Sequence, residues 1–367
     1  MFYHIFYPLV KYHSVFNVFQ YITFRAIGAF ITAALICFIF GPKIIKSLKK
    51  HNAIEKISDD LPDSHKKKKG TPTMGGLIII LGLLVSSMLW NNLANPFVLI
   101  ILLVTFWLAG IGFLDDFLKN IQHIRVGLIE RYKLSGQIIL AVLIAFALYL
   151  GFEETQVFSQ INIPFFKNVS FSLGYFFIPF VALYVTFYSN AVNLSDGLDG
   201  LAAGCIGFVA LGLGVMAYVK GNAVIADYLK IEFIKDAGEL AIFSSAIMGT
   251  ILGFLWFNIK PASVFMGDTG SLSTGGILAM LSILIKEEIF FVIISSIFLV
   301  EALSSLVQRY YFKYTRKKTG KGKRIFLCAP LHHHFELKGW SEQKIVVRFW
   351  IITMIMTAIG LATLKLR

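Results

Sequence analysis

The chain has 367 residues, of which 57% are hydrophobic and only 15% charged, and its mean hydropathy is +0.73. A soluble globular domain is about 45–50% apolar and about 25% charged, so this composition excludes an ordinary soluble protein. The net charge of +13 lies mostly in loops. That pattern is typical of membrane topology and of contact with anionic lipid. We therefore expect a lipid bilayer, and no nucleic acid, as a partner.

Apolar runs recur along the whole chain, most of them near the length of about 20 residues that a membrane-spanning helix needs. Such runs favour helices over a transmembrane barrel, whose strands alternate in hydropathy. We expect an all-α polytopic membrane protein that forms a single domain over residues 1–367. The predicted spans, about ten, are residues 22–42, 74–91, 97–114, 135–151, 173–189, 200–218, 239–257, 272–285, 289–311 and 346–364. The eighth is short and rich in Gly and Ser, which would suit a tilted or partly re-entrant segment.

The distribution of Lys and Arg predicts how these spans are oriented. Nine Lys lie between residues 43 and 70, and nine Lys and Arg lie between residues 313 and 344. Short basic loops stay on the cytoplasmic side, so both chain termini should lie outside. The loops expected in the cytoplasm are residues 43–73, 115–134, 190–199, 258–271 and 313–345.

The first motif is residues 66–76, where a run of Lys meets a Gly-Thr-Pro-Thr turn. Lys beside such a turn resembles a phosphate cradle, although the residue order of a Walker A loop is absent. Membrane topology explains the Lys run equally well. Topology does not require the turn, which makes the turn the more informative half of the motif.

The second motif is the pair Asp115 and Asp116 at the end of the third apolar run. Acidic side chains there are costly unless they are partnered or solvated. They are either two solvated acids in a loop or a Mg²⁺ ligand beside a base. Neighbouring residues of a helix point about 100° apart, so one carboxylate can face a metal while the other faces a nucleophile.

Two further motifs combine polar residues with Gly. Asn190, Asn193, Asp196 and Asp199 recur every third residue, which on a helix or a 3₁₀ turn places them along one face. The alternative is a turn made by two Asp-Gly pairs. Asp268 precedes another apolar run in the pattern of a helix N-cap. Free backbone N–H groups at such a position also suit phosphate or metal binding.

The last motif contains three consecutive histidines, residues 332–334. A zinc site is disfavoured because adjacent side chains diverge and no Cys or spaced His completes the ligand set. We expect contact with phosphate, or proton donation, instead. Glu301 and Arg309 lie inside the ninth span, where a charged side chain is either functional or paired with another helix.

These five segments, in this order from about residue 43 to the C-terminus, resemble the polyprenyl-phosphate N-acetylhexosamine-1-phosphate transferases. Gly-Thr-Pro-Thr-Met-Gly-Gly and Pro-Leu-His-His-His-Phe-Glu are similar to the branch that uses UDP-N-acetylmuramoyl-pentapeptide. The resemblance implies a Mg²⁺-dependent enzyme, with undecaprenyl phosphate as acceptor and UMP as leaving group. It also implies a homodimer in the bacterial cytoplasmic membrane, with the active site facing the cytoplasm.

The resemblance also implies site residues. The catalytic residues would be Asp115, Asp116, Asp268 and His332. Asp268 and Asp116 would bind the metal, and we expect Asp115 to act as the base. The residues expected to contact substrate are Lys68, Thr73, Lys133, Asn190, Asn193, Asp196, Asp199, Asn258, Phe265 and His333.

Two other functions stay open at this point. A sister transferase would use UDP-N-acetylglucosamine; such enzymes share the Asp pair but differ at the His segment. A secondary transporter would carry charges in the middle of its spans and show internal repeats. Here the acidic motifs end spans, and we find no repeat, so a transporter is the more remote alternative.

Overall fold

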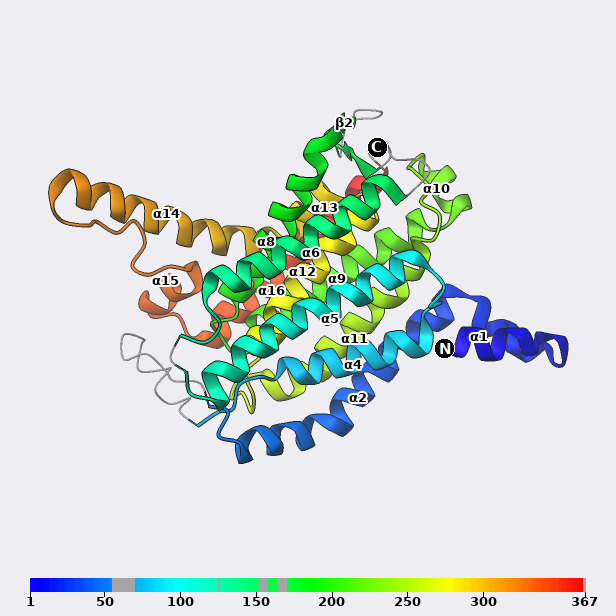
Figure 1. Cartoon of the computed structure of the whole chain (residues 1–367), viewed down its shortest axis with the longest axis horizontal. Helices are drawn as coiled ribbons and strands as arrows, with labels where there is room; N and C mark the ends of the chain where they lie inside the picture. The colour runs from blue at the N-terminus through cyan, green and yellow to red at the C-terminus, as the bar shows by residue number, and fades with distance from the viewer. Residues whose placement is uncertain (55–69, 125, 152–157, 164–169, 366–367) are drawn as a thin grey trace.

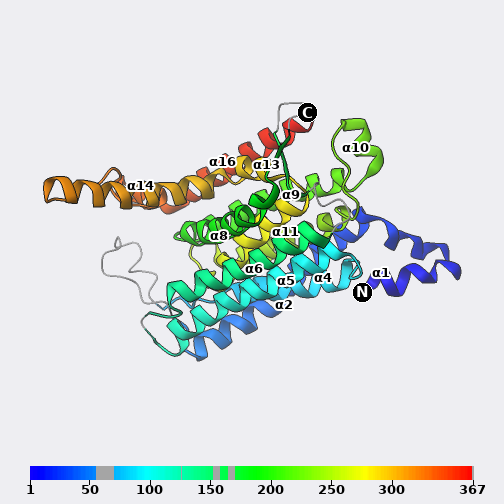
Figure 2. The ribbon, with the colours of Figure 1, turned by 45° about the horizontal axis from the view of Figure 1, so that its top comes forward.

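Figure 1 shows the computed structural model, which describes residues 1–54, 70–124, 126–151, 158–163 and 170–365. Most helices run side by side in one elongated bundle. Helix α14 projects from one end of the bundle and the N-terminal helix α1 from the other, which Figure 2 shows from a second direction.

The longer helices build the bundle, and they are α2 (Ile22–Lys50), α4 (Gly76–Trp90), α5 (Pro96–Asp116), α6 (Glu130–Gly151), α8 (Phe177–Ser195), α9 (Leu201–Lys220), α11 (Gly238–Asn258), α12 (Gly267–Leu284), α14 (Ser296–Thr319) and α16 (Glu342–Ala362). Shorter helices and two antiparallel strands connect them: α1 (Phe2–Phe6), α10 (Ala223–Leu229), α13 (Glu288–Ile294), α15 (Leu331–Leu337), β1 (Gln160–Asn162) and β2 (Ser170–Ser172). A π-helical turn, η3 (Phe117–Ile121), extends α5.

The predicted all-α membrane fold is confirmed. Among the described helices, seven are long and apolar enough to cross a membrane. An eighth is added if α13 and α14, which meet at a bend of 78°, count as one span. The two other predicted spans correspond to α4, which has only 15 residues, and to α12. Each predicted span therefore coincides with a helix or with the bent pair.

Helix α12 forms the centre of the bundle, and every residue from Thr269 to Leu284 is buried. Small residues allow this burial, because helices without large side chains at a crossing pack backbone against backbone. A Cβ on Gly76 of α4 would lie 2.1 Å from the backbone N of Gly270. A Cβ on Gly275 would lie 2.5 Å from the carbonyl O of Tyr188 on α8. The Gly- and Ser-rich segment is thus a continuous central helix.

The N-terminus and the end of α16 lie at the same end of the bundle. The amino group of Met1 donates a hydrogen bond to the carbonyl O of Met88 (2.7 Å), in the last turn of α4. The opposite end of α4 abuts the start of α12, because Gly76 N donates to Met266 O (2.7 Å). Helix α16 also begins at this second end, where Glu342 accepts from the backbone N of Asp199 (2.9 Å).

Candidate active site

Two helices bring the predicted acidic residues together at the end of the bundle where α12 begins. Asp115 and Asp116 are the last two residues of α5, and Asp268 is the second residue of α12. Lys133 lies in the first turn of α6, and Lys119 lies in η3. These five side chains, here called the carboxylate–lysine cluster, carry a net charge of −1 when all are ionised.

Asp115 is the anchor of the cluster. Its side chain is fully buried, and it accepts hydrogen bonds from Lys119 Nζ (2.6 Å) and Lys133 Nζ (2.8 Å). The backbone N of Leu128 donates to its other oxygen (2.8 Å). Lys133 also forms an ion pair with Asp268, and Lys119 Nζ lies 3.6 Å from the same carboxylate. Two ammonium groups therefore lie between the Asp115 and Asp268 carboxylates.

Asp116 differs from Asp115 in its partners, because both of its carboxylate oxygens accept hydrogen bonds from the first turn of α12. Its Oδ1 accepts from the backbone N of Asp268 (3.1 Å). Its Oδ2 accepts from the backbone N and the hydroxyl of Thr269 (2.8 and 2.6 Å). A carboxylate at a helix N-terminus satisfies donors that have no partner within the helix. Asp116 thus fixes where Asp268 lies, and Gly267 (φ +73°) makes the turn that allows it.

The cluster fits Mg²⁺ better than a metal that needs a full set of protein ligands. Within the described parts of the chain, no group of three His, Cys, Asp or Glu is arranged to hold an ion. Mg²⁺ typically keeps several waters and binds one or two carboxylates plus substrate phosphates. Asp268 suits that role because its side chain is 16% exposed, whereas Asp116 is 3% exposed and engaged by α12. The metal-ligand role of Asp116 stays a prediction.

The polar face predicted along residues 190–199 lies beside this cluster at the end of α8. Ser271 in the first turns of α12 donates to Asn193 Oδ1 (2.9 Å). Asn190 instead donates to Gln137 on α6 (2.9 Å) and to the carbonyl O of Thr186. Asp196 follows the last residue of α8. The structure thus brings Asn193 to the start of α12, and Asn190 to the α6–α8 contact.

Asp199 and Asn258 brace the loop that precedes α12. Asp199 Oδ2 accepts from the backbone N of Ala262 (3.2 Å). Asn258 accepts from Gly200 N (3.0 Å) and donates to Val264 O (2.9 Å), so it joins two loops. In this structure both side chains hold backbone in place. Their expected contact with substrate stays a prediction.

Thr73 and Phe265 lie on the remaining side of the start of α12. Thr73 is 2% exposed, and its Oγ1 would lie 3.0 Å from a Cβ placed on Gly267. The Phe265 backbone pairs with the turn preceding α4, through Pro72 O (2.9 Å) and Gly75 N (2.7 Å). The Thr-Pro-Thr turn is thus joined to the acidic motif. Lys68 lies outside the described residues.

The three histidines turn to different partners. His332 is 1% exposed and binds Glu301 of α14 (Nδ1 to Oε2, 3.0 Å). His333 binds Glu336 (2.7 Å). His334 Nδ1 accepts from the backbone N of Leu327 (3.1 Å), and partial burial, with the nearby Lys338, lowers the pKa of His334. His332 also contacts the turn after α8, because a Cβ on Gly197 would lie 2.2 Å from its Nε2.

Three contacts of the site were not predicted from the sequence. Lys119 follows Asp115 by four residues, a spacing that pairs side chains on a helix and would have indicated the ion pair. Thr269 contacts Asp116, which is 153 residues away, so no local pattern points to it. Glu301 was noted only as a charge within a span, and its partner became visible in the structure.

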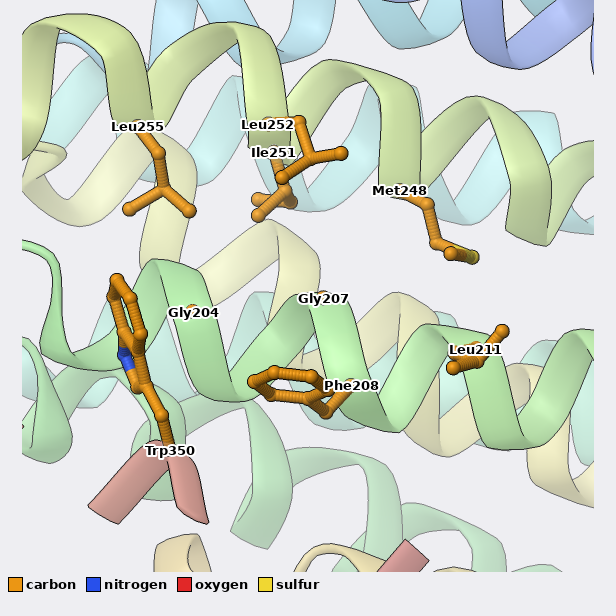
Figure 3. Close-up of a pocket in the computed structure, with 9 residues that line it drawn as sticks. All are labelled: Gly204, Gly207, Phe208, Leu211, Met248, Ile251, Leu252, Leu255 and Trp350. Carbon is orange, nitrogen blue, oxygen red and sulfur yellow. The ribbon is translucent and has the colours of Figure 1, made fainter. Parts of the chain in front are cut away.

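A separate cavity of about 210 Å³ lies between α9 and α11, with Trp350 of α16 at one end (Figure 3). Its lining is apolar, apart from the Trp350 indole N–H, which donates to Gly200 O (3.1 Å). The cavity contains no group that could perform phosphate chemistry. The carboxylate–lysine cluster is therefore the better candidate for the active site.

Comparison with known proteins identifies segments and relatives that this chain is similar to. Residues 98–286 match the family described as Glycosyl transferase family 4. Residues 68–80 match Phospho-N-acetylmuramoyl-pentapeptide-transferase signature 1. The phospho-N-acetylmuramoyl-pentapeptide-transferases of Chlorobium limicola and Chloroherpeton thalassium are 49% and 48% identical to this chain, over 96% of this chain and 95% of each relative. The enzyme of the same name from Chlorobium luteolum is 46% identical over 99% of this chain and 100% of its own length.

Proposed function

Because the chain belongs to the phospho-N-acetylmuramoyl-pentapeptide-transferase family, we propose that it carries out the transfer for which the family is named. In this proposal phospho-N-acetylmuramoyl-pentapeptide passes from its UDP-linked form to undecaprenyl phosphate. The products are UMP and the first lipid intermediate of peptidoglycan synthesis. The observation that carries the proposal is the carboxylate–lysine cluster at the start of α12, beside the signature segment.

The chemistry required is an exchange of one phosphoanhydride for another. A phosphate oxygen of the lipid attacks the β-phosphorus of the nucleotide, and the bond from that phosphorus to the bridging oxygen of UMP breaks. The attacking and attacked groups are both anions, so catalysis consists mainly of positioning and charge neutralisation. Lys133 and Lys119 supply positive charge beside Asp268. Asp115 holds both ammonium groups in place, and its expected role as base stays a prediction.

We propose Mg²⁺ as the cofactor and Asp268 as its main protein ligand. The ion would neutralise charge on the diphosphate when bound. Asp116 contributes by fixing the first turn of α12, so that the Asp268 carboxylate faces the lysines. Lys133 pairs with both Asp115 and Asp268. A metal held by Asp268 would leave the bond from Lys133 to Asp115 in place and would make a second ammonium proton available to a phosphate.

The residues around the cluster are proposed to bind the two substrates. Phe265 is the candidate for stacking on uracil, and His332 and His333 are candidates for phosphate contacts. We place this site on the cytoplasmic face of the bacterial membrane, because Lys and Arg concentrate in the loops at this end. We further propose that the enzyme is a homodimer.

Transfer of radiolabel into lipid tests the proposal directly. Purified protein is incubated with undecaprenyl phosphate, Mg²⁺ and UDP-N-acetylmuramoyl-pentapeptide labelled in the sugar, and the organic-extractable label is counted. We expect labelled lipid and stoichiometric UMP, with UDP-N-acetylglucosamine giving neither. Transfer from UDP-N-acetylglucosamine alone would identify a sister transferase. Absence of transfer from both nucleotides by a folded protein would refute the proposal.

A further inference from the structure

Glu301 uses both carboxylate oxygens to hold one residue. Oε1 accepts from the backbone N of His332 (3.1 Å), and Oε2 lies 3.0 Å from Nδ1 of its ring. Both side chains are 1% exposed. Glu301 lies in the second turn of α14, and His332 is the second residue of α15. Two contacts from one buried carboxylate therefore fix the backbone and the ring of His332 together.

This contact determines which ring nitrogen of His332 remains available. An ionised carboxylate can only accept hydrogen bonds, so the nitrogen facing it carries a proton. The tautomer of a histidine is set by the partner of one ring nitrogen, and the other nitrogen is then left for chemistry. Here Nδ1 faces Glu301, so Nε2 is the atom left.

Nε2 is buried and has no hydrogen-bond partner among the described residues. A buried polar atom without a partner costs about 1–3 kcal/mol, so Nε2 calls for a partner that the described residues do not supply. Nε2 points at the turn after α8, where a Cβ on Gly197 would lie 2.2 Å away. A purely structural His–Glu pair has no need for a second, unpartnered nitrogen directed at this turn.

We propose that Glu301 is a positioning residue for the phosphate transfer: it fixes His332 so that Nε2, the unprotonated ring nitrogen, accepts a hydrogen bond from a protonated phosphate oxygen of the substrates at the turn formed by Asp196 and Gly197. The arrangement resembles other active sites in which a carboxylate orients a histidine and the histidine contacts the reacting group. This inference rests on the proposed function for the identity of the phosphate. The Glu301–His332 geometry does not depend on it.

A double-mutant cycle tests whether Glu301 acts through His332. Loss of a residue that orients a catalytic histidine costs from about 10-fold to about 10⁴-fold in turnover. We expect Glu301→Gln to lower kcat within that range with little change in KM. If Glu301 acts only through His332, adding Glu301→Gln to His332→Gln causes no further loss. Additive losses would overturn the proposal.

The matched control is Glu336→Gln, which breaks the neighbouring His–Glu pair at His333. We expect its effect to be additive with that of His332→Gln, because Glu336 does not hold the His332 ring. Equal coupling of Glu301 and Glu336 to His332 would show a general disturbance of the segment and would count against a specific positioning role.

A measurement that needs no turnover and a variant at a second residue keep the test independent of the folding of Glu301→Gln. Nitrogen-15 NMR of His332 in the full-length protein without substrate should show a proton on Nδ1 that is lost in Glu301→Gln. An unprotonated Nδ1 in the unmodified protein would overturn the proposal. This result stands even if the enzyme transfers a different sugar, so failure of the proposed function is distinguishable.

Gly197→Ala leaves Glu301 intact and acts on the other side of the ring. The φ of Gly197 lies outside the left-handed region, so the added Cβ acts through its contact with Nε2. We expect a lower kcat, whereas Gly151→Ala, whose Cβ meets no atom within 4 Å, should leave kcat unchanged. Full turnover by Gly197→Ala would overturn the placement of Nε2 at this turn.

Discussion

At the scale of single residues, the three aspartates differ in what their oxygens contact. Asp115 is saturated by two ammonium groups and a backbone N–H. Asp116 is saturated by the first turn of α12. Asp268 is the one whose carboxylate is partly exposed, and it pairs with Lys133 and lies 3.6 Å from Lys119 Nζ. The same residue type therefore supplies an anchor for lysines, an anchor for a helix and a candidate metal ligand.

We predict that Asp268→Asn weakens the response to Mg²⁺. Loss of one preorganised electrostatic group typically lowers turnover by about 10²–10³-fold. Turnover measured over a range of Mg²⁺ concentrations should fall by that order and should need more metal for half-maximal activity. Asp227→Asn is the control, because the Asp227 side chain is 82% exposed on α10 and lies outside the cluster. Near-normal turnover of a folded Asp268→Asn at limiting Mg²⁺ would contradict a ligand role.

The three histidines give a second prediction. His332→Ala should lower turnover far more than His334→Ala, because His332 is buried against Glu301 while His334 bonds only a neighbouring loop. The rings bind separate partners, so none of the described histidines belongs to a three-ligand metal group. Purified protein should contain no stoichiometric zinc by elemental analysis. Bound zinc, or equal losses at all three positions, would contradict this assignment.

At the scale of secondary structure, the position of Asp268 depends on how closely α5 and α12 approach. Gly112 of α5 allows this approach, because a Cβ there would lie 2.4 Å from the carbonyl O of Asp268. That atom belongs to the backbone, so the clash cannot be relieved by a side-chain rotation. Gly110 lies two residues away on the same helix, and a Cβ there meets no atom within 4 Å. The two glycines thus form a matched pair.

We predict that Gly112→Ala is destabilising and inactivating, whereas Gly110→Ala is neither. Overpacking of a close contact costs about 1–3 kcal/mol. The shift of α12 that relieves it would also move Asp268 away from Lys133. Thermal unfolding in detergent and transfer assays on both variants measure the two effects. Equal behaviour of the two variants would show that the α5–α12 approach does not control the site.

The whole molecule shows which features were predictable from sequence. The spans could be predicted because apolar runs are local and long, and the all-α membrane fold followed from them. The convergence of Asp115 and Asp268 at one end followed from alternation of the spans. Most contacts of the carboxylates could not be predicted, since Thr269 reaches Asp116 only through helix packing and Leu128 reaches Asp115 from the loop before α6. The bend between α13 and α14 was also missed, because the apolar runs on the two sides of Ser295 and Ser296 together have the length of one span.

The chain termini lie at one end of the bundle and the carboxylate–lysine cluster lies at the other. Which end faces the cytoplasm can be tested. Helix α10 and the far end of α14 lie toward opposite ends of the bundle in both views (Figures 1 and 2). Lys318 lies in the last turn of α14, and Val224 on α10 is 79% exposed. The basic loops predict that Lys318 is cytoplasmic and that Val224 is outside.

We predict that a membrane-impermeant thiol reagent added to intact cells modifies Val224→Cys and spares Lys318→Cys. Both substitutions are made in a background without Cys37, Cys205 and Cys328, which removes every native thiol. Permeabilised cells provide the control, because both positions are exposed and should then react equally. The reverse pattern would place the carboxylate–lysine cluster outside the cell. The proposed function places the cluster on the cytoplasmic face, so this result would contradict that part of the proposal.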